Sequence, residues 1–501
     1  MSTQPEAQVK EKLPLRTWVI LGAVSMGSFT LTSVFSMMTI AIPAVADDLN
    51  ASVGASQWMV LMSTGLMAGL GPLYGRLSDI WGRPRMFVLG LVIYSLGSVG
   101  SALAWDIGSL IGARVIAGLG GAMVMVNALA IITDTFPPGR RGLALGLLGT
   151  ITSAALLLGP TLGGVMVTNL GWRSIFWFNV ALGFGAAVLA LVTIPNKRSD
   201  RKAEPIDWLG AFLVLAGLGL ILLGFSKGLT WGWGSPATLG SILGGMVIGV
   251  VFVTRQLHAA HPLVDITLFR IGLFAGGQVT MLAVNGVMSG MAFMLALYWQ
   301  GPQGLSAQGA GLLMLALPVP MVVVSAVSGR MSDVISPRWL TLSGMAVMIV
   351  GALLVSAASA STAVWDVVWR ITILGVGLGI YTAPTENLLM SSVPVERRGV
   401  AAGLVGLFRF SASSIGVAIA GAIYVTVLVS QLGNDASLRG TPADFTALSN
   451  DPTALAALKD AAVDGVRVVF LSITVLLSVG GAIAWFLFTR VKDHKEAVEA
   501  S

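Results

Sequence analysis

Apolar residues occupy most of the chain in long blocks, and short polar segments separate one block from the next. About 20 mostly apolar residues are enough for a helix to cross the hydrocarbon core of a bilayer. A lipid-exposed strand would leave backbone groups without hydrogen bonds, so each block is predicted to be a helix. Fourteen blocks reach this length, at residues 17–42, 57–75, 86–104, 108–133, 143–168, 174–194, 207–227, 237–254, 271–299, 308–328, 339–359, 366–391, 400–427 and 466–489.

The basic residues indicate how the helices are oriented. Of the 29 lysine and arginine residues, 21 lie in every second polar segment, from the N-terminal residues 1–16 to the tail 490–501. Loops rich in lysine and arginine stay in the cytoplasm. We therefore predict a multi-pass protein of the plasma or inner membrane with both termini in the cytoplasm, which an even number of helices allows.

Composition excludes several classes of protein. Charged residues make up 10% of the 501 residues, against about 25% in soluble domains, so a soluble or disordered chain is excluded. The chain has no cysteine, which excludes disulfides and cysteine-ligated metals. No lysine follows a glycine, so no phosphate-binding loop is present and ATP-driven transport is not expected. The net charge of +6 is explained by the cytoplasmic loops and does not indicate nucleic-acid binding. No catalytic or metal-binding pattern stands out, so we expect neither an enzyme nor a cofactor.

Two parts of the chain repeat each other. GRLSDIWGRPR at 75–85 resembles GRMSDVISPR at 329–338, and FPPGRRGLALGL at 136–147 resembles VPVERRGVAAGL at 393–404. Duplication of a helical unit is typical of a two-lobed transporter with its site between the lobes. We predict an all-α membrane protein with a six-helix lobe at 17–194, a cytoplasmic linker at 195–206, two inserted helices at 207–255, a second linker at 256–270, and a second six-helix lobe at 271–489 that includes the extracytoplasmic loop 428–465.

These motifs resemble those of the major facilitator superfamily, in particular its fourteen-helix drug/proton antiporter branch. GRLSDIWGRPR is similar to the family motif between helices 2 and 3, ARVIAGLGGA at 113–122 to that of helix 4, and LLLGPTLGG at 156–164 to the antiporter motif of helix 5. The resemblance implies two six-helix lobes that rock about a shared crevice, with two further helices inserted between them. It also implies proton-coupled export of amphipathic small molecules, of the multidrug and antibiotic-resistance type.

The motifs near helices 2 and 5 suggest moving parts. Asp79 lies at the cytoplasmic end of a predicted helix beside arginines, where a carboxylate can accept hydrogen bonds from a neighbouring helix. Proline and glycine allow a helix to bend, as a hinge in the fifth helix would require. An ordinary charged loop and a simple proline kink are the alternatives. The expected residues are Gly75, Arg76, Asp79, Gly82, Arg83, Arg330 and Asp333 for a latch between the lobes, and Gly159, Pro160, Gly163 and Gly164 for the hinge.

Charges inside the predicted helices are candidates for proton coupling. Glu386 is the carboxylate that we place deep in the membrane, and burial suits a proton carrier because it favours the neutral form. Arg409 on the next helix could instead hold Glu386 in a structural ion pair, and both interpretations stay open here. Arg114 matches the helix 4 arginine that the resemblance associates with proton coupling, with a structural role as the alternative.

One position departs from the branch pattern. Aligning Ala41-Ile42-Pro43 with the family motif of helix 1 places Val34 where an aspartate is usual. A lipid or metabolite exporter with weak or no proton coupling is therefore an alternative, and a non-transporting membrane sensor is a remote one. Polar and aromatic residues among apolar ones could line a cavity for an amphipathic substrate, although helix packing explains each of them too. They are Asn127, Gln278, Asn285, Trp299, Gln300, Tyr381 and Asn387.

Overall fold

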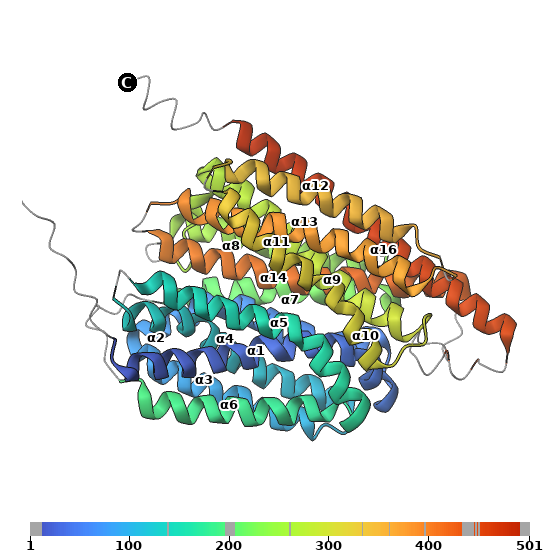
Figure 1. Ribbon diagram of the computed structural model, residues 1–501, viewed down its shortest axis with the longest axis horizontal. Coiled ribbons are helices and arrows are strands. Elements are labelled where there is room, and N and C mark those ends of the chain that lie inside the picture. The colour runs from blue at the N-terminus through green and yellow to red at the C-terminus, as the bar shows by residue number, and fades with distance from the viewer. Residues whose placement is uncertain are drawn as a thin grey trace, which may run out of the picture.

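The computed structural model describes residues 13–137, 140–195, 206–259, 262–332, 334–359, 361–394, 397–432, 445, 448 and 451–490. This part of the chain consists of helices that run side by side in one bundle, without a strand (Figure 1). The helices are α1 (Leu15–Asp48), α2 (Val53–Trp81), α3 (Arg83–Ala102), α4 (Ile107–Thr135), α5 (Arg141–Leu170), α6 (Arg173–Thr193), α7 (Trp208–Trp231), α8 (Pro236–His258), η2 (Ile266–Arg270), α9 (Gly272–Gln300), α10 (Ala307–Leu313), η3 (Met314–Ala316), α11 (Pro318–Met331), α12 (Pro337–Ser356), α13 (Val364–Ser391), α14 (Arg398–Leu432) and α16 (Pro452–Thr489).

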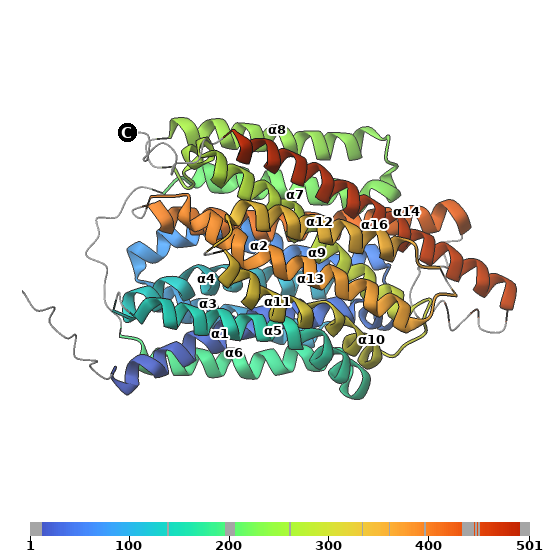
Figure 2. The same ribbon diagram turned by 45° about the horizontal axis from the view of Figure 1, so that its top comes forward.

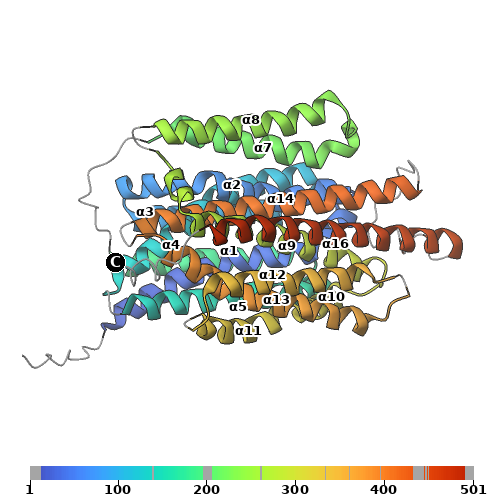
Figure 3. The same ribbon diagram turned by 90° about the horizontal axis from the view of Figure 1, so that it is seen from above.

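The helices form two lobes and a separate pair (Figure 2). Helices α1 to α6 pack together in the first lobe, and α9 to α14 pack with α16 in the second. The pair α7 and α8 lies at the edge of the bundle, with α7 against α2 and α14 (Figure 3). Helix α1 begins and α16 ends at the same end of the bundle (Figure 1). We call it the basic end, after Arg85, Arg140, Arg270, Arg338 and Arg490 in its loops and helix ends.

Thirteen helices in the described part of the chain are long and apolar enough to cross a membrane. This confirms a polytopic membrane protein, but it does not fully confirm the predicted count of fourteen. The difference is α2, which has 29 residues but is less apolar than its neighbours. Its polar side chains Ser56, Gln57, Ser63 and Thr64 are buried against other helices. Contact with protein instead of lipid explains why α2 tolerates them.

The internal repeat is visible in how two helix pairs cross. In the first lobe α3 and α4 meet at Gly90 and Gly120, where a Cβ on Gly90 would lie 2.8 Å from the Gly120 carbonyl oxygen. In the second lobe α12 and α13 meet at Gly344 and Gly377, where a Cβ on Gly344 would lie 2.8 Å from the Gly377 carbonyl oxygen. In a membrane the hydrophobic effect does not drive helices together, because lipid tails are as apolar as the side chains. Glycines help the helices to associate by letting their backbones pack closely. The two lobes therefore use the same packing device at matching places.

A buried polar cluster joins the inserted pair to the segment that leads into the second lobe. Asp207 caps α7 by accepting from the Gly210 backbone N–H at 2.9 Å, and it also accepts from Arg255 at 2.7 Å and from Gln256 at 2.8 Å. Gln256 in turn accepts from the Val264 backbone N–H at 3.1 Å. Burial of Asp207 opposes ionisation, but the hydrogen bonds from Arg255, Gly210 and Gln256 outweigh it and lower the pKa of the carboxyl. The donors around Asp207 therefore favour its ionised form.

We expect Asp207→Asn to lower the stability of the protein by about 1–3 kcal/mol. An amide in this place turns one acceptor oxygen into a donor that faces either Arg255 or Gln256, both of which are donors. The midpoint of thermal unfolding in detergent, followed by tryptophan fluorescence, measures the change. Asp106→Asn is the control, because Asp106 is an exposed cap of α4 and asparagine caps equally well. Equal midpoints for the two variants would show that the cluster adds no stability.

Candidate functional site

Glu386 and Arg409 form an ion pair between α13 and α14. The Glu386 Oε1 atom accepts from Arg409 Nη2 at 2.8 Å. Glu386 lies near the end of α13, one turn or less beyond Pro384, and Arg409 lies about three turns into α14. Their side chains are 54% and 39% exposed. Glu386 is therefore not buried as its place in an apolar block suggested, and water, a proton or a ligand can approach the ion pair.

Arg114 of α4 is buried in the first lobe without a carboxylate partner among the described residues. Only 2% of it is exposed. Its Nε donates to Ser63 Oγ at 3.0 Å, its guanidinium lies 5.5 Å from the ring centre of Phe176, and its Nη1 has no hydrogen-bond partner. Val34, at the position of the usual aspartate, is 1% exposed. The positive charge of Arg114 is therefore held by a hydroxyl and an aromatic ring.

The equivalent arginine of the second lobe has a different environment. Arg370 of α13 donates to Asp366 one turn earlier in the same helix at 2.5 Å, and to the Leu354 carbonyl oxygen at 3.0 Å. In α4 the residue one turn before Arg114 is Leu110, which is buried and apolar. The two repeats therefore keep the arginine, but only the second keeps a carboxylate beside it.

The predicted latch residues form a network inside the first lobe. Arg83 donates to Asp79 at 3.1 Å and to Asp134 at the end of α4 at 2.7 Å. Gly82, between α2 and α3, has a φ of 94°, which favours glycine. Arg76 donates to the Pro262 carbonyl oxygen at 3.1 Å, in the segment that follows α8. Among the described residues Asp79 has no bond to the second lobe, so the network here ties α2, α3 and α4 to each other.

The second copy of the motif is less complete in the described part of the chain. Asp333 lies outside the described residues. Arg330 is exposed at the end of α11 and borders a groove of about 360 Å³ that is otherwise lined by Val327, Met331, Val334 and Ile335. Gly75 of the first copy lies against α4, where a Cβ would be 3.4 Å from Val126. The structure thus gives the first copy an ion-pair network that the described part of the second does not have.

The predicted hinge residues lie where α5 meets α1 and α10. A Cβ on Gly159 would collide with Ser36, and one on Gly163 would lie 3.0 Å from Met37, both in α1. A Cβ on Gly164 would collide with the Ala307 carbonyl oxygen in α10 of the other lobe. Gly311 of α10 has the reciprocal contact with the Pro160 carbonyl oxygen, and Thr161 donates to the Gly311 carbonyl oxygen at 3.1 Å. These residues therefore form the contact between the lobes at the end opposite the basic end.

Most of the predicted cavity residues are buried in helix packing. Asn127 and Asn285 each donate to a carbonyl one turn earlier in their own helix, at 2.7 and 2.9 Å. Gln300 donates across the lobes to the Ile40 carbonyl oxygen at 3.1 Å. Tyr381 donates to Thr280 at 3.3 Å, and the buried side chains of Gln278 and Trp299 have no hydrogen-bond partner among the residues that the structure describes. Asn387 alone of the seven is exposed, and it donates to Ser332 at 3.3 Å.

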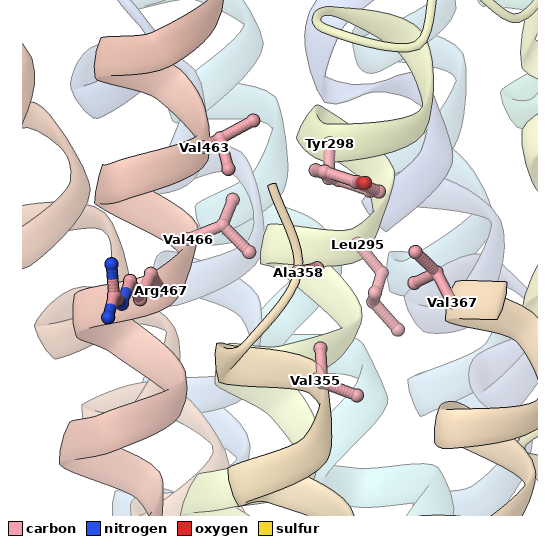
Figure 4. A pocket seen from close by; sticks show the side chains of 8 residues that line it. All are labelled: Leu295, Tyr298, Val355, Ala358, Val367, Val463, Val466 and Arg467. Carbon is pink, nitrogen blue, oxygen red and sulfur yellow. The ribbon is translucent and has the colours of Figure 1, made fainter. Parts of the chain in front are cut away.

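A small cavity lies inside the second lobe, away from the ion pair (Figure 4). Its volume is about 10 Å³, whereas sites for drug-sized ligands hold about 300–1,000 Å³. Val463 and Val466 of α16 face Leu295 and Tyr298 of α9 across it (Figure 4). It has room for a water molecule at most and does not compete with Glu386 and Arg409 as a ligand site.

Comparison with known families identifies this arrangement. The family model of the Major Facilitator Superfamily matches residues 24–417 and 279–501. The chain belongs to the Major Facilitator Superfamily. This is a family of transporters, and the predicted resemblance is confirmed.

Curated relatives of this chain include proteins that are named for export and efflux. The chain is 28% identical over 450 residues to the tetracenomycin C resistance and export protein of Streptomyces glaucescens, covering 89% of this chain and 82% of that one. It is 30% identical over 452 residues to the drug efflux pump JefA of Mycobacterium tuberculosis, covering 88% and 85%. The crystal structure of a bacterial homologue of the lysosomal transporter Spinster, inward-facing and unoccupied, shares the fold at a TM-score of 0.70 and 16% identity, covering 95% and 97%.

Proposed function

We propose that this protein is a secondary active exporter that exchanges inward-moving protons for amphipathic small molecules by alternating access. The basic end faces the cytoplasm, with both termini, in the plasma or inner membrane. The names of the related efflux and export proteins support the direction of transport and the class of substrate. The contact of α5 with α10 supports closure at the extracytoplasmic end.

The exposed ion pair of Glu386 and Arg409 is the observation that carries this proposal. A charged pair would be costly against lipid, so its exposure indicates that it faces an aqueous path between the lobes. Glu386 takes the proton on the extracytoplasmic side. Arg409 competes with the proton for the carboxylate, and this competition favours release when the path opens to the cytoplasm.

Other predicted residues have supporting parts in this mechanism. Arg114 tunes the proton site, and Asp79 with its arginines latches the lobes in the outward-facing state. Gly159, Pro160, Gly163 and Gly164 form the hinge. The exposed Asn387 and the unpaired polar groups of Gln278 and Trp299 contact the substrate, together with Asn127, Asn285, Gln300 and Tyr381 once the helices shift.

The test is proton movement in proteoliposomes that contain purified protein. Addition of a transported compound should drive proton movement in the wild type, and Glu386→Gln should reduce this movement by about 100-fold or more, because a removed general proton acceptor typically costs this much. Asp106→Asn, which neutralises an exposed carboxylate at the start of α4 outside the proposed site, is the control. Full proton-coupled export by the Glu386→Gln variant would contradict the assignment of Glu386.

A second candidate is an exporter of a lipid or metabolite with weak or no proton coupling. Val34 at the usual aspartate position favours it, as does the lack of a carboxylate beside Arg114 in the described part of the chain. Undiminished transport after collapse of the proton gradient would support this candidate over the first.

A further inference from the structure

Helix α7 of the inserted pair contacts α2 of the first lobe and α14 of the second, and α2 and α14 also contact each other (Figure 3). The two lobe helices are bonded directly, because the hydroxyls of Thr64 and Ser414 share a buried hydrogen bond of 2.6 Å. Helix α7 fits closely against α2, since a Cβ on Gly69 would collide with Leu215. One inserted helix therefore touches both lobes along the line where they meet.

Two tryptophans fasten the inserted pair to the lobes at the end opposite the basic end. Trp58, in the second turn of α2, donates from Nε1 to Ser226 of α7 at 2.5 Å. Trp233, between α7 and α8, donates from Nε1 to Thr426 of α14 at 3.0 Å. One bond thus holds the first lobe and the other holds the second.

The segment that follows α8 contacts the same two lobes at the basic end. We call residues 262–270 the strap. The Pro262 carbonyl oxygen accepts from Arg76 of α2 at 3.1 Å. The Leu263 side chain packs against two apolar clusters, one in the first lobe with Leu73 and one in the second lobe with Leu389. A single side chain of the strap therefore lies between the lobes.

The strap is also bonded to the second lobe and to the inserted pair. The Asp265 carboxylate lies 3.6 Å from the guanidinium of Arg397, the residue before α14. The Val264 backbone N–H donates to Gln256 of α8 at 3.1 Å. Helices α7 and α8 and the strap thus form one unit, which we call the brace. Polar contacts join the brace to both lobes at both ends of the bundle.

The other side of the lobe interface is joined differently. Helices α5 and α11 lie on the side of the bundle away from α7 and α8 (Figure 3). There α5 packs against α10 and η3, with hydrogen bonds from Thr161 to Gly311 and from Gln308 to Thr168 at the end opposite the basic end. Beyond η3, α11 packs against α13 of its own lobe. The interface is therefore fastened more firmly on the α2–α14 side.

We propose that the brace makes the α2–α14 side the pivot of the transporter, so that the lobes separate and close on the α5 side. Rotation about the α2–α14 line keeps the contacts of the brace and the bond between Thr64 and Ser414, whereas separation along this line would break them at a cost in free energy. This inference rests on the proposed alternating access, and it gives the inserted pair a role in that movement.

Disulfides on the two sides of the interface test the pivot. The natural chain has no cysteine, so each disulfide is the introduced one. One variant carries Thr64→Cys with Ser414→Cys and the other Thr168→Cys with Gln308→Cys, because a hydrogen bond already joins each pair of residues. Transport of the amphipathic dye Hoechst 33342 is measured in everted membrane vesicles. Oxidation should leave transport unchanged in the first variant and lower it at least about tenfold in the second, since a locked contact leaves one state of a two-state equilibrium. A reductant should restore it.

A second measurement tests the brace without a substrate. Thr64→Cys is labelled with a maleimide in the purified protein, and the buried position reacts when the α2–α14 side opens. Adding Trp58→Phe and Trp233→Phe keeps the rings but removes both N–H donors, so labelling should rise at least about tenfold. Trp231→Phe is the matched control, because Trp231 is an exposed tryptophan at the end of α7 and should leave labelling unchanged.

The outcomes separate the pivot from the proposed function. Equal labelling in the double tryptophan variant and in Trp231→Phe would overturn the role of the brace. A loss of transport with either disulfide would overturn the pivot and leave alternating access intact. Full transport with both disulfides oxidised would instead contradict alternating access, and the pivot with it.

Discussion

Replacing Gly311 by alanine should reduce export by about tenfold or more while the protein stays folded. A Cβ at this position would collide with the Pro160 carbonyl oxygen of α5, and a backbone atom cannot move aside as a flexible side chain can. Overpacking of this kind costs about 1–3 kcal/mol, and this cost applies only to the conformation in which α5 and α10 touch. The population of that conformation should therefore fall by about tenfold or more.

Two measurements check this expectation. Export is followed in everted membrane vesicles, and closure is followed by labelling a single cysteine placed at Thr168, whose hydroxyl accepts from the Gln308 backbone at 3.1 Å across the lobes. The natural chain has no cysteine, so the label reports this position alone. Labelling should increase in the Gly311→Ala variant, because the extracytoplasmic contact is open for more of the time.

Gly149→Ala is the matched control for this substitution. Gly149 lies in the same helix as the hinge, and a Cβ there would have no atom within 4 Å. Alanine also favours a helix over glycine by about 1 kcal/mol, so export and labelling should stay at wild-type levels. If Gly311→Ala behaved like Gly149→Ala, the close contact of α5 with α10 would not be needed for transport.

The sequence predicted the parts of the fold that depend on local composition. Apolar blocks gave the helices, and the repeated Gly-Arg-x-Ser-Asp strings gave the two lobes, because both signals are contained in short stretches of chain. The sequence predicted α2 as one of fourteen spanning helices, but its mean hydropathy falls short of that of the thirteen others because it carries polar residues such as Ser56 and Gln57, which are buried against other helices. A count of helices by hydropathy treats every side chain as if it met lipid, so it leaves out a helix whose polar side chains meet protein.

Partners that lie far apart in sequence were not predictable in the same way. Asp134 as the second partner of Arg83, Gly311 as the counterpart of Pro160, and Asp207 as the acceptor for Arg255 depend on which helices become neighbours. The polar side chains proposed for the cavity show the converse problem. Asn127 and Asn285 bond to their own helices, and nothing in sequence distinguishes such a side chain from one that faces a ligand.

The second large effect is expected at Arg114. Substitution to methionine should raise the stability of the protein and lower export, because Arg114 is a buried charge without a counter-charge in the described part of the chain, and such a charge is costly to keep. Ser63, the acceptor for Arg114, also donates to the Met59 carbonyl oxygen at 3.3 Å, so its hydroxyl keeps a partner after the change. For whole buried ion pairs or triads, replacement with apolar side chains of similar volume is neutral or stabilises by up to about 4 kcal/mol, and a lone buried arginine should follow the same direction.

Arg370→Met is the matched control, and the sign of its effect should differ. Arg370 has Asp366 as an ionic partner, so its loss leaves a carboxylate unpaired and should not stabilise the protein. Unfolding midpoints from tryptophan fluorescence and proton-driven export in vesicles are measured for both variants. A higher midpoint with lost export in Arg114→Met would mean that the arginine is kept for transport at the expense of stability. A lower midpoint in both variants would instead show that Arg114 stabilises the folded protein. The hydroxyl of Ser63 and the ring of Phe176 would then compensate for the cost of burying its charge.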